Sequence, residues 1–366
     1  MTIKPWRATC IQMKSRLATK AADRDGAWEI IKGHIDRAVA MIEATCEGPN
    51  PPKLVVLPEF GMQGPPHGGT VVDWIEKGCY PIPGRISEPF QALARRLGIY
   101  IAANQFEVDP QWPGRFFNSC FLINPKGDVL LRFRRINTAS WPSPHDLMDA
   151  YIKHHGLAGT FPVVDTDLGR LAMLACGELA VPEVARVLMM RGAEVILHPT
   201  NEQYSPAQEA AKISRPAENM IYLVSANVAG GIGFSADGSV LGGRSRIVDF
   251  RGQTLAYDES TEESDKVSSE IDIEALRTAR RDLGMGNSIL RSRFEMYQPF
   301  YSEAVFYPAN QFLVEPMPES GAARPVAEIA LKKLELLGIV TPAPESDGPG
   351  LKQNVNAMTG ARHLAR

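Results

Sequence analysis

Cys176 stands where a reactive thiol would stand in an α/β protein. The apolar run LAMLA ends directly before it, and a helix is expected to begin near Pro182. A side chain between a strand end and a helix start meets exposed backbone N–H groups, whose partial positive charge favours thiolate over thiol. The same groups could stabilise an oxyanion. Because a free cysteine is more often a small buried hydrophobe, Cys176 alone does not define a site.

Glu59 and Arg135 occupy the same kind of position as Cys176. Glu59 follows the apolar run LVVLP, and a partly buried carboxylate is unfavourable unless it is paired or used. A desolvated glutamate has a raised pKa, which suits removal of a thiol proton near neutral pH. Arg135 comes near the end of VLLRFRRI, where a fixed cation could stabilise thiolate and oxyanion. The alternatives are a structural ion pair for Glu59 and a surface arginine for Arg135.

Other polar side chains near these positions are candidates for a substrate pocket. Glu178 is expected to hold the turn that carries Cys176, by accepting hydrogen bonds from backbone N–H groups. Asn201, Glu202 and Tyr204 follow the apolar run EVILHPT, at the place where a substrate would lie. They are therefore expected to line the pocket.

Strands and helices alternate along most of the chain, and this order must position the three groups. Strands are expected at residues 8–13, 53–57, 99–108, 116–123 and 129–136, and helices at 87–97, 182–191 and 206–220. A loop rich in Pro, Ser and His is expected over residues 137–160. The alternation predicts an α/β fold with helices covering mixed sheets.

Composition excludes several classes of function. The net charge is −3 with 22% charged residues, so neither nucleic acid nor a membrane is an expected partner. No segment approaches the roughly 18 apolar residues of a membrane span, and the N-terminus lacks the pattern of a signal peptide. Five cysteines without regular spacing argue against a disulfide framework and indicate the cytoplasm. The histidines near Asp146 lack metal-ligand spacing, so no metal is expected.

The order of Glu59, a basic residue and Cys176 resembles the nitrilase, or carbon–nitrogen hydrolase, superfamily. The matching segments run from about residue 5 to residue 280 and include Leu57-Pro58-Glu59, Pro125-Lys126-Gly127, Cys176-Gly177-Glu178, Gly192-Ala193-Glu194 and Arg215-Pro216-Ala217-Glu218-Asn219. The resemblance implies an αββα four-layer sandwich, catalysis through a thioester acyl-enzyme, and no metal or organic cofactor.

Two points of the family pattern need comment in this chain. The family's lysine is expected after an aromatic–basic pair, where this chain has Arg135. Arginine keeps the charge and adds a planar fork of donors, but it holds its proton at any useful pH. Many members also carry an acidic residue between the lysine and the cysteine. Asp146 is the candidate for that accessory acid, with His145 or Asp149 as alternatives.

The resemblance favours an amidase that acts on a small amide and releases ammonia. Cys176 is followed by Gly177, where nitrilases proper carry a tryptophan, and both Gly177 and His145 are candidate pocket residues. The segment LRTARRDLGMGNSILRSRFEMY is similar to the tail of aliphatic amidases. The alternatives are a nitrilase, a relative that transfers the acyl group, and a catalytically silent homologue disabled by Arg135.

Two regions are expected. Residues 1–280 form the hydrolase domain, and residues 281–366 form a C-terminal extension with a polar end. The extension is rich in aromatic residues, which usually bury themselves against another surface. In aliphatic amidases this tail locks subunits together, so the resemblance implies a homodimer or a larger homo-oligomer.

Overall fold

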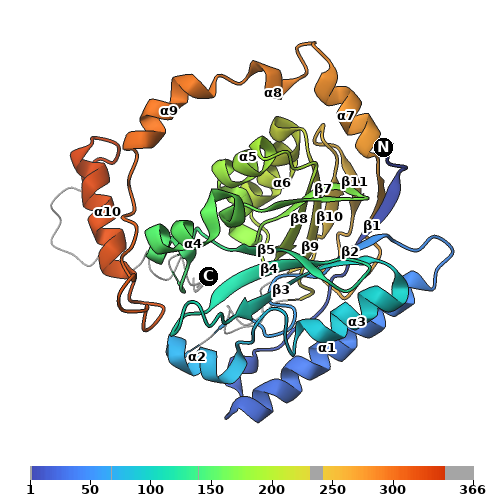
Figure 1. Cartoon of the computed structure of the whole chain (residues 1–366), viewed down its shortest axis with the longest axis horizontal. Coiled ribbons are helices and arrows are strands. Elements are labelled where there is room, and N and C mark those ends of the chain that lie inside the picture. The colour runs from blue at the N-terminus through green and yellow to red at the C-terminus, as the bar shows by residue number, and fades with distance from the viewer. Residues whose placement is uncertain (1, 67, 139, 231–241, 343–366) are drawn as a thin grey trace, which may run out of the picture.

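The computed structural model describes residues 2–66, 68–138, 140–230 and 242–342 of the chain. Its centre consists of two six-stranded sheets (Figure 1). The first has the order β12-β1-β2-β3-β4-β5, built from β1 (Trp6–Cys10), β2 (Leu54–Val56), β3 (Tyr100–Glu107), β4 (Phe117–Ile123), β5 (Val129–Arg134) and β12 (Ser268–Ile271). The second has the order β11-β10-β9-β8-β7-β6, built from β6 (Val163–Thr166), β7 (Gly169–Met173), β8 (Val195–Thr200), β9 (Tyr222–Asn227), β10 (Arg246–Val248) and β11 (Thr254–Tyr257).

Each sheet has three consecutive parallel strands, and the strands around them pair antiparallel. In the first sheet β1, β2 and β3 are parallel, and in the second β7, β8 and β9 are parallel. Parallel strands end at one edge of a sheet, and ligands of open α/β sheets bind beyond these carboxyl ends. The residues that follow β2, β7 and β8 are therefore placed where a site can form.

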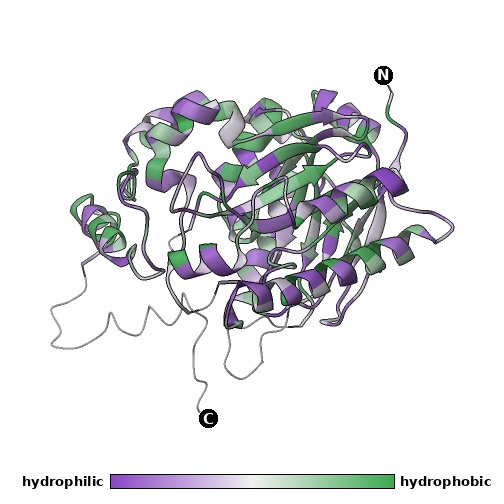
Figure 2. Ribbon diagram, turned by 60° about the horizontal axis from the view of Figure 1, so that its bottom comes forward, coloured by the Kyte–Doolittle hydropathy of each residue, from purple (hydrophilic) through white to green (hydrophobic). Residues whose placement is uncertain are grey.

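Helices cover the outer face of each sheet. The first sheet carries α1 (Arg24–Cys46) and α3 (Ser87–Leu97), and the second carries α5 (Pro182–Met190) and α6 (Pro206–Asn219) (Figure 1). Helix α1 packs on its sheet through one apolar face. The buried residues of this face recur at helical spacing, namely Ala27, Ile31, Ile35, Ala38 and Ile42. Figure 2 shows largely hydrophobic strands beneath helices of mixed hydropathy. No helix in the described ranges is long and apolar enough to cross a membrane.

The space between the sheets is filled by an apolar core. Side chains of β1 and β2 pack there with side chains of β7, β8 and β9, which makes the two sheets the inner layers of a four-layer molecule. The predicted αββα sandwich is therefore confirmed. Its core consists mostly of fully buried aliphatic residues, for example Ala8, Val56, Leu171 and Leu197.

The loop predicted over residues 137–160 is wrong, because most of this segment is helical. A 3-10 turn, η2 (Pro144–Leu147), leads directly into α4 (Met148–Thr160). Ser143 and Asp146 form a capping box at the start of η2, and Pro144 occupies the first helical position, where its missing N–H has no cost. Composition suggested a loop, whereas the capping residues start a helix. A further short helix, α2 (Val71–Gly78), begins with a capping box of Thr70 and Asp73.

The C-terminal extension runs as an arc beside the sandwich (Figure 1). Helix α7 (Ile273–Arg281) leads into it, and it contains α8 (Ser288–Arg291), α9 (Phe294–Glu303) and α10 (Arg324–Leu336). Between α9 and α10 the chain returns to the body, where Asn310 N donates to His145 O at 3.0 Å and Phe312 N donates to Asp146 O at 3.1 Å. The predicted polar end falls almost entirely in residues 343–366, outside the described residues.

Candidate active site

Glu59, Arg135 and Cys176 are carried to one place by three different strands. Glu59 follows β2, Arg135 is the first residue after β5, and Cys176 follows β7. The first two strands belong to one sheet and the third to the other, so the three groups meet across the interior of the sandwich. Arg135 was predicted at the end of a strand, and β5 does end one residue before it, at Arg134, while Arg135 N still donates to Asn118 O of β4 at 2.9 Å.

The Glu59 carboxylate is fully buried and is fixed through one of its two oxygens. Oε1 accepts a hydrogen bond from Asn118 Nδ2 at 2.7 Å and lies 3.3 Å from Arg135 Nη1. Asn118 is held in turn by Asn104, whose Nδ2 donates to Asn118 Oδ1 at 2.6 Å. Oε2 has no fixed hydrogen-bond partner among the described residues. This oxygen is therefore the one that can take up a proton.

Burial sets the protonation of Glu59. Desolvation raises the pKa of its carboxyl, and the positive charge of Arg135, the hydrogen bond from Asn118 and the nearby Cys176 thiol partly offset this shift. The negative charge of Glu202 raises the pKa of Glu59 further. The result is a carboxylate within hydrogen-bond reach of the thiol and with more affinity for a proton than an exposed glutamate has.

Cys176 is held in a conformation that few residues adopt. Its φ is +43°, in the left-handed region, at the first residue of the 3-10 turn η3 (Cys176–Ala180). The backbone carbonyl of Cys176 accepts a hydrogen bond from His198 Nε2 at 3.0 Å. His198 Nδ1 therefore accepts from Ser225 Oγ, 2.9 Å away. Burial lowers the pKa of His198 to about 3, so the imidazole is neutral and serves as a support rather than as a base.

The Cys176 sulfur lies 3.5 Å from the carbonyl oxygen of Asn201, and the residue retains 9% of its exposure. Burial and the Glu59 charge raise the pKa of the thiol, and Arg135 only partly offsets them. The expectation that a helix start would favour thiolate is therefore wrong for the resting site. Desolvation and a neighbouring carboxylate outweigh the partial charges of backbone N–H groups. A base is needed to ionise this thiol.

Arg135 is a fixed cation. Burial disfavours the charged guanidinium, but the charges of Glu59, Cys176 and Glu178 leave its pKa raised above the ordinary arginine value. Its guanidinium carbon lies 5.9 Å from the centre of the Trp141 ring, within the range of a cation–π contact. Arg135 thus stays protonated beside the sulfur and the carboxylate.

Glu178 links the segment of the nucleophile to the segment of the cation. Its carboxylate is fully buried and accepts hydrogen bonds from the backbone N–H groups of Ile136 and Asn137, and from Asn137 Nδ2 at 2.6 Å. Glu178 was predicted to accept hydrogen bonds from the turn around Cys176. In the structure its donors are instead the two residues that follow Arg135. Charge-assisted bonds of this kind fix the relative position of the two segments.

A family model for carbon–nitrogen hydrolases matches residues 7–281 of this chain, which is most of its length. The chain belongs to the carbon–nitrogen hydrolase family. It is therefore a hydrolase of carbon–nitrogen bonds, and the residues that follow β2, β5 and β7 are the natural place for its chemistry.

Relatives of this carbon–nitrogen hydrolase include amidases and nitrilases. It is 29% identical over 241 residues to an (R)-stereoselective amidase of Pseudomonas sp, covering 65% of this chain and 79% of the relative. It is 30% identical over 247 residues to a nitrilase of Pyrococcus abyssi, covering 67% of this chain and 86% of the nitrilase. The crystal structure of Saccharomyces cerevisiae Nit3, a member of branch 10 of the nitrilase superfamily, aligns with a TM-score of 0.60 at 19% identity. That alignment covers 78% of this chain and 96% of Nit3, and it concerns the fold alone.

Glu202 lies close enough to the site of this hydrolase to act on it by charge. It follows Asn201, whose carbonyl contacts the sulfur, and it raises the pKa of both Glu59 and Cys176. Glu202 is buried and forms an ion pair with Lys212 Nζ, which is itself almost fully buried on α6. Tyr204 is 59% exposed and lies farther out, under the guanidinium of Arg244.

Lys212 is a buried charged residue near the site that sequence reasoning missed. It also lies 3.1 Å from Glu209, which pairs with Arg246, so four alternating charges run along one side of the site. The available signal was position: Lys212 falls on the inner face of the helix expected over 206–220, where a lysine is rarely buried unless paired.

Asp146 and His145 lie where the extension returns to the body, because their carbonyl groups accept hydrogen bonds from Phe312 N and Asn310 N. Asp146 Oδ2 accepts a hydrogen bond from Ser143 N at 2.8 Å, and its charge interacts with Arg115. His145 packs near Tyr307 of the extension, with ring centres 5.8 Å apart. The main groups that shift the pKa of Cys176 are Glu59, Arg135, Glu202 and Thr200. Glu202 is thus an acidic group that acts on Cys176 by its charge, and the role of Asp146 as the accessory acid stays a prediction.

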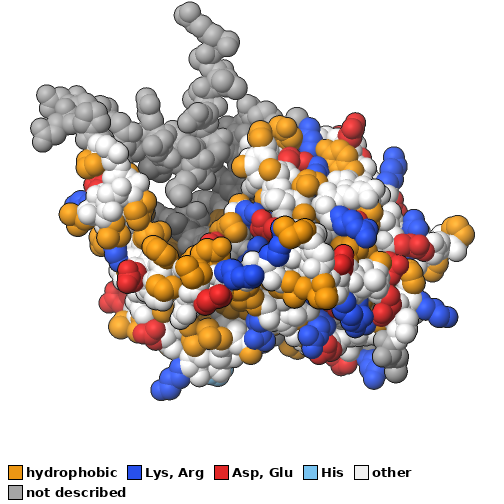
Figure 3. All heavy atoms as spheres, turned by 90° about the horizontal axis from the view of Figure 1, so that it is seen from above, with side chains coloured by type: hydrophobic (Ala, Val, Ile, Leu, Met, Phe, Trp, Pro, Cys, Tyr) orange, Lys and Arg blue, Asp and Glu red, His pale blue; other side chains and the backbone are white. Residues whose placement is uncertain are grey.

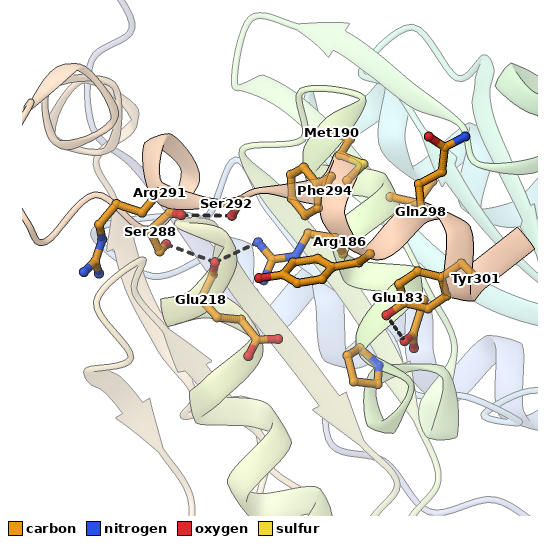
Figure 4. Close-up of a pocket in the computed structure, with 13 residues that line it drawn as sticks. Glu183, Arg186, Met190, Glu218, Ser288, Arg291, Ser292, Phe294, Gln298 and Tyr301 are labelled. Atoms are coloured by element: carbon orange, nitrogen blue, oxygen red, sulfur yellow. Dashed lines mark hydrogen bonds between the residues drawn. The ribbon is translucent and has the colours of Figure 1, made fainter. Parts of the chain in front are cut away.

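No cluster of His, Cys, Asp or Glu suited to a metal ion occurs within the described ranges. A groove of about 700 Å³ lies apart from the catalytic groups, between α5, the end of α6 and the extension (Figure 4). Its lining includes Met190, Phe294 and Tyr297, and Tyr301 Oη donates to Glu183 Oε1 at 3.0 Å on one side. The groove belongs to the junction with the extension and does not contain Cys176.

Proposed function

We propose that this carbon–nitrogen hydrolase is an amidase with Cys176 as its nucleophile. Oε2 of Glu59 takes the thiol proton while the sulfur adds to the amide carbonyl. Arg135 stabilises the oxyanion that forms. When the carbon–nitrogen bond breaks, Glu59 returns the proton to the leaving nitrogen, so that ammonia departs and a thioester remains. Water, deprotonated by Glu59, then cleaves the thioester, and the sulfur regains its proton.

The observation that carries this proposal is the arrangement of Glu59. One carboxylate oxygen is bound by Asn118 and Arg135, and the other is unpaired within the described residues, beside a thiol that cannot ionise easily by itself. An unpaired buried oxygen is unfavourable unless it has a use. Gly177 in place of the tryptophan of nitrilases, together with the relation to an amidase, supports an amide as the substrate.

Release of ammonia from a panel of small amides tests this function directly. Cys176→Ala should abolish release, and intact-mass analysis should show a covalent adduct on wild-type protein only. Cys46→Ala serves as the control, because Cys46 is a free cysteine of α1 on the outer layer. Ammonia release that persists in Cys176→Ala would remove the proposal.

Arg135 in the place of the family's lysine supports a second candidate, a silent relative that binds small molecules without turnover. Arg135→Lys separates the two, because activity that appears only in this variant indicates the silent protein. Mass spectrometry of the products separates hydrolysis from acyl transfer to an amine and from hydrolysis of a nitrile.

We further propose that a second copy of this chain packs against the extension, and that the protein works in the cytoplasm. The extension exposes Met296, Phe300 and Tyr301 at 67%, 76% and 62%. Figure 3 shows hydrophobic side chains gathered on the face of the molecule that carries the extension. All five cysteines are free, which suits a reducing compartment.

A further inference from the structure

Arg135 and Gly177 lie against each other in this structure. Arg135 stands where the family has lysine, and Gly177 stands where nitrilases proper have tryptophan. A Cβ atom built on Gly177 would lie 2.9 Å from Arg135 Nη2, closer than carbon atoms approach such a group in folded proteins. The φ of Gly177 is outside the left-handed region, so its backbone conformation does not require glycine. Space for the guanidinium requires it.

The guanidinium cannot easily move away from a side chain at position 177. Its Nη1 lies 3.3 Å from Glu59 Oε1, and the ring of Trp141 lies beside it. The two residues that follow Arg135 are tied by their N–H groups to Glu178. The Arg135 side chain is only 16% exposed. A methyl group on residue 177 would therefore displace the guanidinium from its present place beside Glu59.

We propose that Gly177 is a positioning residue, whose missing side chain allows the Arg135 guanidinium to lie beside Cys176 and to replace the family's lysine as the oxyanion-stabilising cation. The inference rests on the proposed function. A lysine at this position would place one compact ammonium group at the end of a flexible chain. The planar guanidinium of arginine is wider and needs more room. The fork can bond Glu59 with Nη1 and keep Nη2 for the substrate oxygen. Positions 135 and 177 then work as a matched pair.

A double-mutant cycle tests the pair with Gly177→Ala, Arg135→Lys and the double variant. Gly177→Ala should lower kcat for a good amide substrate at least about tenfold with little change in KM, because the oxyanion forms only after the amide has bound. In the Arg135→Lys background the same change should lower kcat less than about threefold, because lysine leaves room for the methyl group. Gly33→Ala, where an added Cβ meets nothing within 4 Å, is the matched control.

The reactivity of Cys176 toward iodoacetamide supplies a readout that does not need turnover. The Arg135 charge lowers the pKa of the thiol, so displacing it should move the alkylation midpoint of Gly177→Ala to higher pH. The shift should be absent when Gly177→Ala is added to Arg135→Lys. If Gly177→Ala alone does not fold, the double variant should recover a wild-type unfolding temperature, since the clash is gone.

Equal losses in both backgrounds, or no loss in the wild-type background, would overturn the matched pair. Failure of the proposed function looks different: the wild-type protein would hydrolyse no amide, while the alkylation shifts would still depend on residue 135. A coupled alkylation shift therefore supports the pair in either case, and an uncoupled shift refutes it.

Discussion

Burial keeps the Cys176 thiol and the Glu59 carboxyl from ionising as readily as they would in water. Each group has a raised pKa, and the first cause in both is removal from solvent. In the proposed mechanism the thiol is neutral at rest, and its proton moves to Glu59 only as the sulfur adds to a substrate carbonyl. Arg135 is proposed to stabilise the negative charge that then forms, without exchanging a proton.

Asn118 lowers the pKa of Glu59, the proposed base. Asn118→Ala should therefore move the acid limb of the pH–rate profile to higher pH. Activity needs the ionised carboxylate, so it falls as pH drops through the raised pKa of Glu59. The hydrogen bond from Asn118 lowers that pKa, and its loss raises the pKa further. The acid limb of kcat/KM, measured for both proteins, checks the direction. A limb that stays in place or moves to lower pH would contradict Glu59 as the base.

Glu202 acts on the same pair through its charge, and Glu202→Gln should shift the pH profile in the opposite direction. Removal of this negative charge lowers the pKa of both Glu59 and Cys176. Alkylation of Cys176 should then begin at lower pH than in the wild-type protein. Asp146→Asn is the comparison for the accessory acid named from sequence, and it should leave the alkylation curve unchanged. An equal shift in both variants would show that the two carboxylates were assigned wrongly.

At the scale of elements, the site depends on where strands stop. β2, β5 and β7 end shortly before Glu59, Arg135 and Cys176, respectively, and the segments after β5 and β7 are joined by Glu178. The turn η2 and helix α4 form a second junction, where Asp146 is buried and the extension returns to the body. This junction, rather than the catalytic groups, surrounds Asp146.

Asp146→Asn should change how stability depends on pH. Burial raises the pKa of Asp146 to about 6, above its ordinary value near 4, so the folded protein binds this proton more tightly than the unfolded chain does. The stabilisation by the proton is complete below about pH 4 and is lost as pH rises to about 6. Asparagine is neutral throughout, so the variant should gain on the order of 2 kcal/mol relative to wild type between pH 4 and pH 7.

Urea unfolding at both pH values measures that gain. The control is Asp149→Asn, one turn later and exposed, which should follow the wild-type protein. If Asp146→Asn had the same free energy of unfolding as the wild-type protein at both pH values, the charge of Arg115 would offset the desolvation of the Asp146 carboxylate.

At the scale of the whole molecule, the extension presents an apolar surface that the body does not cover. Phe300 of α9 is 76% exposed, and the neighbouring groove between α5 and the extension is lined by Met190 and Phe294 (Figure 4). Apolar patches of this kind on a folded chain usually mark an interface. A second copy is the partner that resemblance to aliphatic amidases implies.

Phe300→Glu should therefore shift the protein toward monomer. Burying a phenylalanine stabilises an interface by about 1.5–3 kcal/mol, and a buried unpaired carboxylate would oppose association further. Light scattering during size-exclusion chromatography measures the mass of both proteins. Leu157→Glu is the control, because Leu157 is also exposed, at 64%, but lies on α4 of the body. A wild-type protein that is monomeric at all concentrations would contradict the proposed assembly.

Sequence alone placed Glu59 and Cys176 after apolar strands, and it predicted the alternation of strands and helices from which the sandwich is built. These features are local, because they depend on hydrophobic periodicity and on the residue type found directly after a strand. The 3-10 turn at residues 144–147, which leads into the helix at 148–160, was also a local feature, but its Ser143–Asp146 capping box was overlooked in favour of composition. Lys212 could have been predicted as a buried, paired lysine from its position on the inner face of the expected helix.

Only the tertiary structure decided which acids act on the sulfur by charge, how burial affects the pKa of the thiol, and which side chain lies against Gly177. Glu202, Lys212 and Arg135 come from different layers, and their distances to Cys176 depend on how two sheets pack. A pKa depends on the solvent that packing removes, and a steric contact depends on atoms far apart in the chain. Neither the pKa nor the steric contact can be predicted from the spacing of residues along a strand.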